Sequence, residues 1–226
     1  MPDATNVREM FSRITPRYDF LNHLLSLNLD RLWRRALVRE GLSHHPGRIL
    51  DLATGTGDVA IQFRAMSQDP FIAGADYCLP MLACAPAKAA GEKRIAWAAA
   101  DALRLPFKSG AFDLVTIAFG LRNFADIAAG LSEIRRVTAP GGRLLVLEFS
   151  MDLAPWFSLF YKPYFRHVLP RVGRWLSGSG AYAYLCDSVE QFPKPADVLR
   201  AICEAGFPCA EARTMTGGSV VLYAAE

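Results

Sequence analysis

From Arg48 onward, the chain alternates short apolar runs with longer amphipathic stretches. The alternation predicts strands over residues 49–50, 71–75, 95–98, 112–117 and 143–148, and helices over residues 59–66, 81–89 and 127–137. Pro140-Gly141-Gly142 is predicted to form the turn before the last of these strands, because glycine readily adopts positive φ. Strands and helices that alternate in this way indicate an α/β fold.

The segments on either side of this core have their own character. We expect helices at 6–14, 19–27 and 30–40, and after the core an aromatic stretch at 156–175, a small-residue loop at 177–180, a helix at 195–205 and strands at 209–214 and 219–224. The chain is therefore interpreted as one domain over residues 1–226. It comprises a helical cap (1–45), a cofactor-binding core (46–150), a substrate-side insertion (151–190) and a terminal helix with strands (191–226).

Composition excludes several classes of protein. The 226 residues are 52% hydrophobic, which is enough for a full core, and the net charge of +3 is too small and dispersed for a nucleic-acid-binding protein. The longest stretches without a charged residue contain twelve residues, whereas a bilayer span needs about twenty. The first residues carry charges and no apolar run, so we expect no secretory signal and a cytoplasmic location.

The five cysteines are an odd number at irregular spacings, without a C-x-x-C pair. This pattern favours neither a disulfide framework nor a metal site. We expect free thiols, most of them buried.

The turn after the first strand reads Asp51-Leu52-Ala53-Thr54-Gly55-Thr56-Gly57-Asp58. Gly55 and Gly57 lack a Cβ atom, so backbone N–H groups at the helix start can approach a ligand closely. A plain tight turn also fits, and Gly55, Gly57 and Ala60 satisfy the G-x-G-x-x-A form of the dinucleotide fingerprint. The turn alone leaves its ligand open.

Acidic residues on or after three successive strands narrow the choice of ligand for this turn. Asp76 ends the second strand, where a carboxylate can accept both hydroxyls of a ribose, and Asp101 follows the third, beside the expected adenine position. Asp51 precedes the glycine turn, where a negative charge suits a cationic amino-acid cofactor and repels a pyrophosphate. This pattern resembles the class I S-adenosylmethionine-dependent methyltransferases. A short-chain dehydrogenase is disfavoured, because no tyrosine has a lysine four residues later.

Segments outside the glycine turn are more specific to one family than the turn itself. They are Arg17-Tyr18-Asp19, Leu32-Trp33-Arg34-Arg35, Leu105-Pro106-Phe107, Phe119-Gly120-Leu121-Arg122-Asn123, His167-Val168-Leu169-Pro170 and Thr216-Gly217-Gly218. With them the chain resembles, over nearly its whole length, the ubiquinone/menaquinone biosynthesis C-methyltransferases, which methylate a ring carbon of a polyprenylated quinol. The resemblance implies a Rossmann-like sheet of mostly parallel strands, an antiparallel C-terminal strand, a helical cap and a helical insertion.

The resemblance also implies the site. S-adenosyl-L-methionine is the expected cofactor, bound by Asp51, Ala53, Thr54, Gly55, Thr56, Gly57, Asp76, Tyr77, Asp101, Ala102 and Ala118. Ala118 stands where the family commonly has serine, which leaves only a backbone contact there. The expected reaction converts demethylmenaquinol to menaquinol, or performs the equivalent benzoquinol step.

Five residues are candidates for work on the acceptor. His167 is the predicted general base, because histidine titrates near neutral pH, and Arg122, past the fourth strand, is predicted to stabilise the quinolate. Tyr18, Asp19 and Tyr182 are further candidates, and each of the five has a purely structural alternative, such as packing, capping or a surface ion pair.

The aromatic insertion carries Lys162, Arg166, Arg171 and Arg174 beside its apolar side chains. It predicts a groove for a prenyl tail and peripheral contact with an anionic bilayer, although an ordinary core helix fits equally well. A homodimer or a quinone-synthesis assembly is a further expectation. Two other functions stay open: a methyltransferase acting on another lipid-like acceptor, such as a sterol or fatty acyl chain, and a non-enzymatic scaffold.

Overall fold

The computed structural model describes residues 12, 15, 18–177 and 181–226. The helix predicted at 6–14 and the end of the loop predicted at 177–180 therefore lie mainly outside the described residues.

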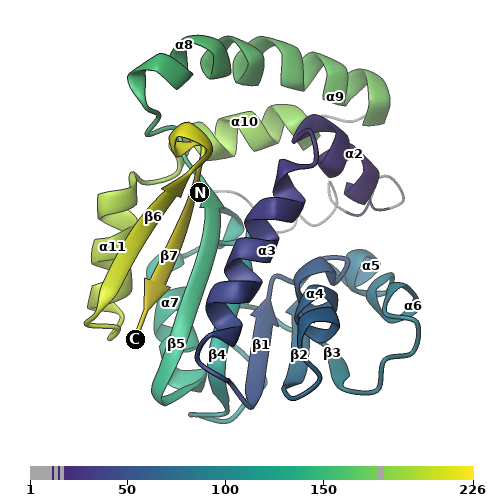
Figure 1. The fold of residues 1–226 in the computed structure, drawn as a ribbon, viewed down its shortest axis with the longest axis vertical. Helices are drawn as coiled ribbons and strands as arrows, with labels where there is room; N and C mark the ends of the chain where they lie inside the picture. The colour runs from purple at the N-terminus through teal and green to yellow at the C-terminus, as the bar shows by residue number, and fades with distance from the viewer. Residues whose placement is uncertain (1–11, 13–14, 16–17, 178–180) are drawn as a thin grey trace.

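A seven-stranded sheet in the order β3-β2-β1-β4-β5-β7-β6 forms the centre of the molecule (Figure 1). Its strands are β1 (Arg48–Leu52), β2 (Phe71–Asp76), β3 (Ile95–Ala99), β4 (Phe112–Ala118), β5 (Thr138–Phe149), β6 (Ala210–Met215) and β7 (Val220–Ala225). Neighbours among β1 to β5 pair in parallel, whereas β7 runs antiparallel to both β5 and β6. The predicted mostly parallel sheet with an antiparallel C-terminal strand is confirmed.

Helices cover both faces of the sheet because alternate strand residues point to opposite sides. Leu50 and Leu52 belong to the core formed with α7 (Ile127–Val137) and α11 (Pro195–Glu204). Ile49, the residue before Leu50, points to the opposite face and belongs to the core formed with α3 (Leu29–Leu42) and α4 (Asp58–Met66). Both faces of β1 are thus buried, as its continuous apolar sequence requires.

Two predicted elements differ from the structure. The helix predicted at 81–89 is split into α5 (Leu79–Leu82) and α6 (Ala85–Lys88), because Pro86 lacks an N–H and ends a continuous helix. The predicted turn at Pro140-Gly141-Gly142 lies inside β5 as an irregularity, where the partners of Phe112 and Leu114 jump from Thr138 to Arg143. Gly141 has φ +71°, so its positive φ serves a bulge.

The expectation that most cysteines are buried is wrong for three of the five. All five are free thiols, and Cys84, Cys203 and Cys209 are exposed. Cys203 lies on α11, where Val198 and Ile202 are the buried side chains. A helix that buries one face leaves its other positions in water.

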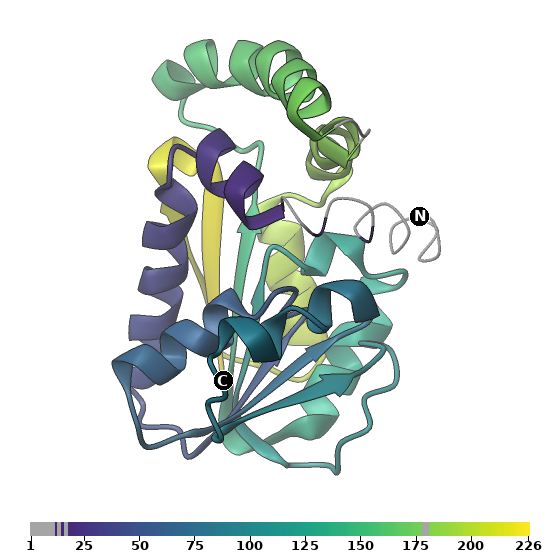
Figure 2. The ribbon, with the colours of Figure 1, turned by 90° about the vertical axis from the view of Figure 1, so that its right-hand side faces the viewer.

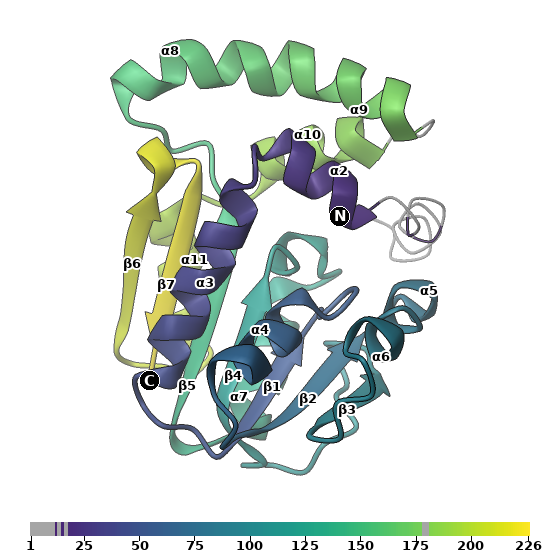
Figure 3. The same ribbon diagram turned by 45° about the vertical axis from the view of Figure 1, so that its right-hand side comes forward.

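The insertion forms a roof beyond the carboxyl ends of the parallel strands. It contains α8 (Pro155–Pro163), a π-helical turn (Tyr164–Val168), α9 (Leu169–Ser177) and α10 (Ala181–Gln191). Figures 2 and 3 show α8 and α9 lying across the top, with α2 (Tyr18–Leu25) beneath α9. Within the part of the chain that the structure describes, no helix combines the length and apolarity that crossing a bilayer requires.

Candidate active site

Asp51, near the end of β1, lies under the glycine turn and is only 1% exposed. Its Oδ2 accepts a hydrogen bond from Thr54 Oγ1 at 2.5 Å, and its Oδ1 accepts one from Thr116 Oγ1 at 2.9 Å. Burial raises the pKa of Asp51 to about 6 although both hydroxyl groups favour the charged form. A cationic ligand beside this carboxylate would therefore favour its ionised state.

Asp76, at the end of β2, also holds the glycine turn in place. Its Oδ2 accepts from the backbone N–H of Gly55 at 2.7 Å, and its Oδ1 accepts from that of Cys78 at 2.7 Å. Burial raises its pKa as well. Each carboxylate oxygen can accept a second hydrogen bond, so Asp76 can still take both hydroxyls of a ribose.

Gly57, one of the residues predicted to bind the cofactor, packs against an aromatic ring. A Cβ atom on Gly57 would lie 2.6 Å from Trp97, and the residue has φ +86° as the N-cap of α4. Gly57 is not among the residues that line the cavities around the turn. Its missing side chain makes room for an indole ring, whereas Gly55 lines the cavities and fits the prediction.

A cavity of about 160 Å³ lies beside the turn, and a recess of about 30 Å³ adjoins it, sharing Ala53, Gly55 and Ala118. All the predicted cofactor-binding residues except Gly57 line one or both. The larger cavity takes Ala53, Gly55, Asp76, Tyr77, Asp101, Ala102 and Ala118, and the recess adds Asp51, Thr54 and Thr56. We call the two together the donor site.

The donor site fits S-adenosylmethionine. The buried carboxylates Asp51 and Asp76 offer places for an ammonium group and for ribose hydroxyls, and Asp101 lies at the exposed rim. Arg34 and Asp58, which were not predicted, line the recess as well, so that it holds one cation and two carboxylates. A zwitterionic amino-acid moiety matches this set of charges.

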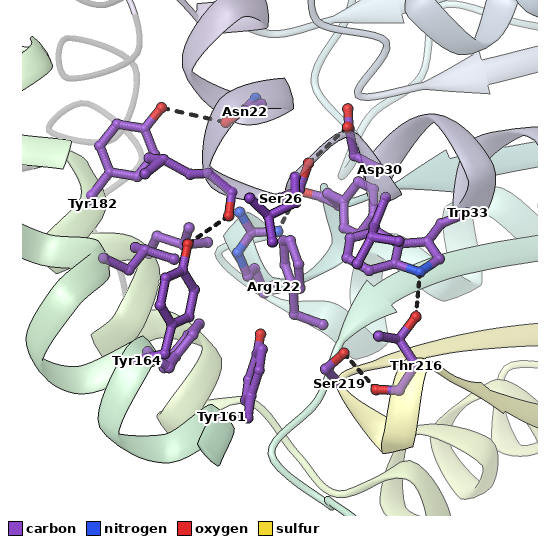
Figure 4. A pocket seen from close by; sticks show the side chains of 18 of the residues that line it. Asn22, Ser26, Asp30, Trp33, Arg122, Tyr161, Tyr164, Tyr182, Thr216 and Ser219 are labelled. Carbon is purple, nitrogen blue, oxygen red and sulfur yellow. Dashed lines mark hydrogen bonds between the residues drawn. The ribbon is translucent and has the colours of Figure 1, made fainter. Parts of the chain in front are cut away.

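A larger cavity of about 300 Å³, the acceptor cavity, lies between the sheet and the roof (Figure 4). Its wall is mainly aromatic and aliphatic. The aromatic residues are Trp33, Phe119, Phe149, Phe157, Tyr161, Tyr164, Phe165, Tyr182 and Tyr184. Leu27 also lines it and is 77% exposed, so the cavity opens to solvent beside the turn between α2 and α3.

Phe119 lines both the donor site and the acceptor cavity. It directly follows β4 and has φ +61°, a conformation that is strained for a phenylalanine. Its N–H donates to the carbonyl of Leu147 at 2.7 Å, and its carbonyl accepts from Arg122. These two bonds hold the ring between the cavities.

Arg122 lines the acceptor cavity as predicted, but its charge is already matched. Its Nη1 lies 2.8 Å from Oε1 of Glu148, and that carboxylate is 0% exposed. The guanidinium also lies over the ring of Phe149, 5.5 Å from its centroid. Sequence reasoning missed Glu148 because a lone glutamate at the end of an apolar strand carries no local pattern.

Three of the other candidates are placed as follows. His167 is exposed on the π-helical turn and is not among the residues that line the acceptor cavity, so its role as general base stays a prediction without support from this placement. Asp19 also lies away from that cavity: its carboxylate accepts from Thr56 Oγ1 at 2.7 Å and from Lys88 Nζ at 2.6 Å, which ties α2 to the glycine turn. Tyr182 lines the cavity, with its hydroxyl 3.5 Å from Oδ1 of Asn22.

Tyr18 opens α2, and its side chain lies outside the described part of the structure. The predicted catalytic set is thus separated. Arg122 and Tyr182 share the acceptor cavity, Asp19 supports the donor site and His167 lies on the outer surface.

Two functional candidates in the acceptor cavity were not predicted. Ser26 lines it from the turn between α2 and α3, and Asp30 from the first turn of α3. The available signal was the spacing of Asp30 and Arg34, which places a carboxylate and a guanidinium one helical turn apart next to a matching segment.

Together, the fold and the two adjoining cavities define a class I S-adenosylmethionine-dependent methyltransferase. A solved methyltransferase from Thermotoga maritima, titled a possible histamine N-methyltransferase, has the same fold, with a TM-score of 0.66, 16% identity and coverage of 96% of this chain and 98% of that one.

The sequence profile of the ubiE/COQ5 methyltransferase family matches residues 2–226, and the chain belongs to this family. A demethylmenaquinone methyltransferase from Thermus thermophilus is 52% identical over 88% of this chain and 91% of its own length. One from Deinococcus radiodurans is 48% identical over 89% and 84%, respectively. The ubiquinone/menaquinone biosynthesis C-methyltransferase UbiE of Syntrophotalea carbinolica is 46% identical over 96% and 92%.

Proposed function

We propose that the protein methylates a ring carbon of a polyprenylated quinol, either a demethylmenaquinol or the equivalent benzoquinol. The single observation that carries this proposal is the meeting of a polar donor site and an aromatic cavity at Phe119. The names of the relatives, demethylmenaquinone methyltransferase and UbiE, support the same substrate class.

The aromatic wall suits a flat ring. Phe119 and Phe149 lie with their centroids 4.5 Å apart, and Trp33 meets both edge-on at about 6 Å, with Nε1 donating to Thr216 Oγ1. A quinol ring held against these side chains can stack and is shielded from water. S-adenosylmethionine supplies the methyl group on its sulfonium sulfur. Holding the ring carbon in line with that group contributes about 7 to 11 kcal/mol to lowering the barrier.

Arg122 helps to position Phe119 in this arrangement. Because Glu148 matches its charge, it presents little net field to the ring, and its bond to the carbonyl of Phe119 holds the shared wall of the two cavities. We therefore propose that Arg122 acts by fixing Phe119 rather than by stabilising the quinolate.

The volume of the acceptor cavity fits a head group, and we propose that a prenyl tail leaves past the exposed Leu27. The roof carries exposed apolar side chains, with Trp156 69%, Phe160 72% and Trp175 84% exposed. The basic residues Lys162, Arg166 and Arg171 of the roof are exposed as well. We propose that these exposed side chains of the roof rest on an anionic bilayer from which the substrate enters.

The catalytic proposal is tested with purified protein, methyl-labelled donor and two short-tailed quinols, one naphthoquinol and one benzoquinol. Labelled ring-methyl product from at least one of them is expected. Only the reduced form should react, because a quinone has no hydroxyl to ionise. Labelling of a sterol or fatty acyl acceptor, with none of either quinol, would contradict the proposal.

The membrane proposal is tested by cosedimentation with vesicles. The double variant Trp156→Ser, Phe160→Ser should lose binding to vesicles containing phosphatidylglycerol, whereas Leu32→Ser, which removes a 60% exposed leucine from α3, should not. If the wild type, the double variant and Leu32→Ser all bound equally to neutral and anionic vesicles, the membrane proposal would be contradicted.

A further inference from the structure

Asp30 combines two properties that rarely occur together in a carboxylate: it lines an apolar cavity and is 3% exposed. It belongs to the first turn of α3, directly behind the mouth of the acceptor cavity at Leu27. A buried charge is retained only where partners satisfy it.

Three partners surround this carboxylate (Figure 4 shows the serine). Ser26 Oγ donates to Oδ1 at 2.7 Å, and His23 Nδ1 lies 2.7 Å from Oδ2. Arg34 Nη1 donates to Oδ2 as well and lies 3.5 Å from Asp58 on α4. Lys88 on α6 pairs with that same Asp58.

The balance of these charges keeps Asp30 ionised. Burial pushes its pKa upward, but the guanidinium of Arg34 and the hydrogen bonds from Ser26 and His23 outweigh burial, and the pKa lies below its ordinary value. The carboxylate is therefore in its proton-accepting form at neutral pH.

The phenols of the cavity are hydrogen-bond donors. Tyr164 donates to the carbonyl of Leu25, and Tyr184 lies 3.0 Å from Oδ1 of Asn123. Burial raises the pKa of both and that of Tyr161, so these phenols stay protonated. Among the described residues that line the cavity, Asp30 is the only carboxylate, and none is a histidine.

We propose that Asp30, through the hydroxyl of Ser26, accepts the proton of the acceptor's hydroxyl group. This inference rests on the proposed quinol methylation and names its base. His23 and Arg34 are positioning residues, because they hold Oδ2 and leave Oδ1 to Ser26, which lines the cavity.

The proton balance is simple. The quinol O–H bond breaks, its proton passes to Ser26 Oγ while the serine proton passes to Asp30 Oδ1, and the electron pair stays on the quinol oxygen. That pair makes the neighbouring ring carbon nucleophilic. After the carbon has gained its methyl group, it loses its own hydrogen as a proton, and the oxygen regains one from Asp30 through Ser26. Each turnover releases one proton net.

The test compares Asp30→Asn and Ser26→Ala with the wild type on the same short-tailed quinol, under anaerobic conditions and over a range of pH. At neutral pH we expect kcat to fall by about 10² to 10⁴-fold in Asp30→Asn, with unchanged affinity for S-adenosylhomocysteine. The deficit should shrink as the pH approaches the ionisation of the quinol itself, because ionised substrate needs no base.

A structural role would give a deficit that does not change with pH. Ser26→Ala, which removes one hydroxyl and leaves the ion pairs in place, should show a smaller deficit that shrinks in the same way, even if Asp30→Asn folds poorly. Asp187→Asn, an exposed aspartate on α10, is the matched control and should behave as the wild type.

An active wild type with an active or pH-independent Asp30→Asn, or with a Ser26→Ala that is unimpaired, would overturn this assignment alone. A wild type that methylates neither quinol would overturn the proposed function, and this assignment with it.

Discussion

Removing the guanidinium of Arg122 should destabilise the protein strongly, because it leaves Glu148 buried without a cation. Glu148 is 0% exposed, and its remaining donors are the backbone N–H groups of Arg122 at 3.2 Å and Phe149 at 2.9 Å. Arg122→Met keeps most of the side-chain volume, so the loss is mainly electrostatic. The carbonyl of Phe119, at φ +61°, loses its partner as well.

Breaking a buried pair in this way costs about 3 to 5 kcal/mol. For a chain of this size, about 2 to 4 °C in Tm corresponds to each kcal/mol, so Tm should fall by roughly 6 to 20 °C. The double variant Arg122→Met, Glu148→Leu should regain most of the loss, since an apolar replacement of both partners removes the unpaired charge.

Urea unfolding and thermal melting of both variants measure these differences. Arg200→Met is the matched control, because Arg200 pairs with Asp197 on the surface and is 64% exposed, and it should change the unfolding free energy by less than about 1 kcal/mol. If Arg122→Met were as stable as this control, or if the double variant were less stable than the single one, the buried pair would not have the role assigned here.

Four further outcomes follow from the site. Asp76→Ala should weaken S-adenosylmethionine binding by about 2 kcal/mol in calorimetry, since charge-assisted hydrogen bonds are lost; unchanged affinity would exclude the ribose contact. Because the pKa of Asp51 is raised to about 6, the free protein holds a proton there below about pH 6, and a cationic donor must displace it; donor affinity should therefore decline as pH falls below about 6, and Asp51→Asn should abolish that dependence. Gly57→Ala should reduce the unfolding free energy by about 1 to 3 kcal/mol, since the new Cβ meets Trp97; a neutral result in urea would show that the ring moves freely. His167→Asn should keep full turnover; a tenfold loss of turnover would show that His167 takes part in the reaction.

The core and donor site could be predicted because their signals are local. Asp51 lies between an apolar run and a glycine turn, and Asp76 ends the next apolar run. Chain order alone therefore places these two carboxylates at one edge of a parallel sheet. The acceptor side depends on how distant helices pack. Whether His167 points inward depends on a π-helical turn after Pro163, which shifts the helical phase by one residue and cannot be read from a period of 3.6.

The contact between Asp30 and His23 could not be predicted from the sequence either. His23 lies seven residues earlier, a spacing that matches two turns of one helix, yet the chain reverses at Leu27 and Asn28, both with positive φ. The contact exists because two helices meet at that corner. Residue types and spacing do not specify it.

Arg34 lines both the donor recess and the acceptor cavity, and one nitrogen, Nη1, faces Asp30 on one side and Asp58 on the other. A ligand that draws the guanidinium toward itself in either cavity loosens its hold on the carboxylate of the other. Such coupling is reciprocal: whatever factor the first substrate imposes on the affinity of the second, the second imposes on the first. A movement of this one guanidinium would thus link the two binding equilibria by the same factor, whichever substrate loads first.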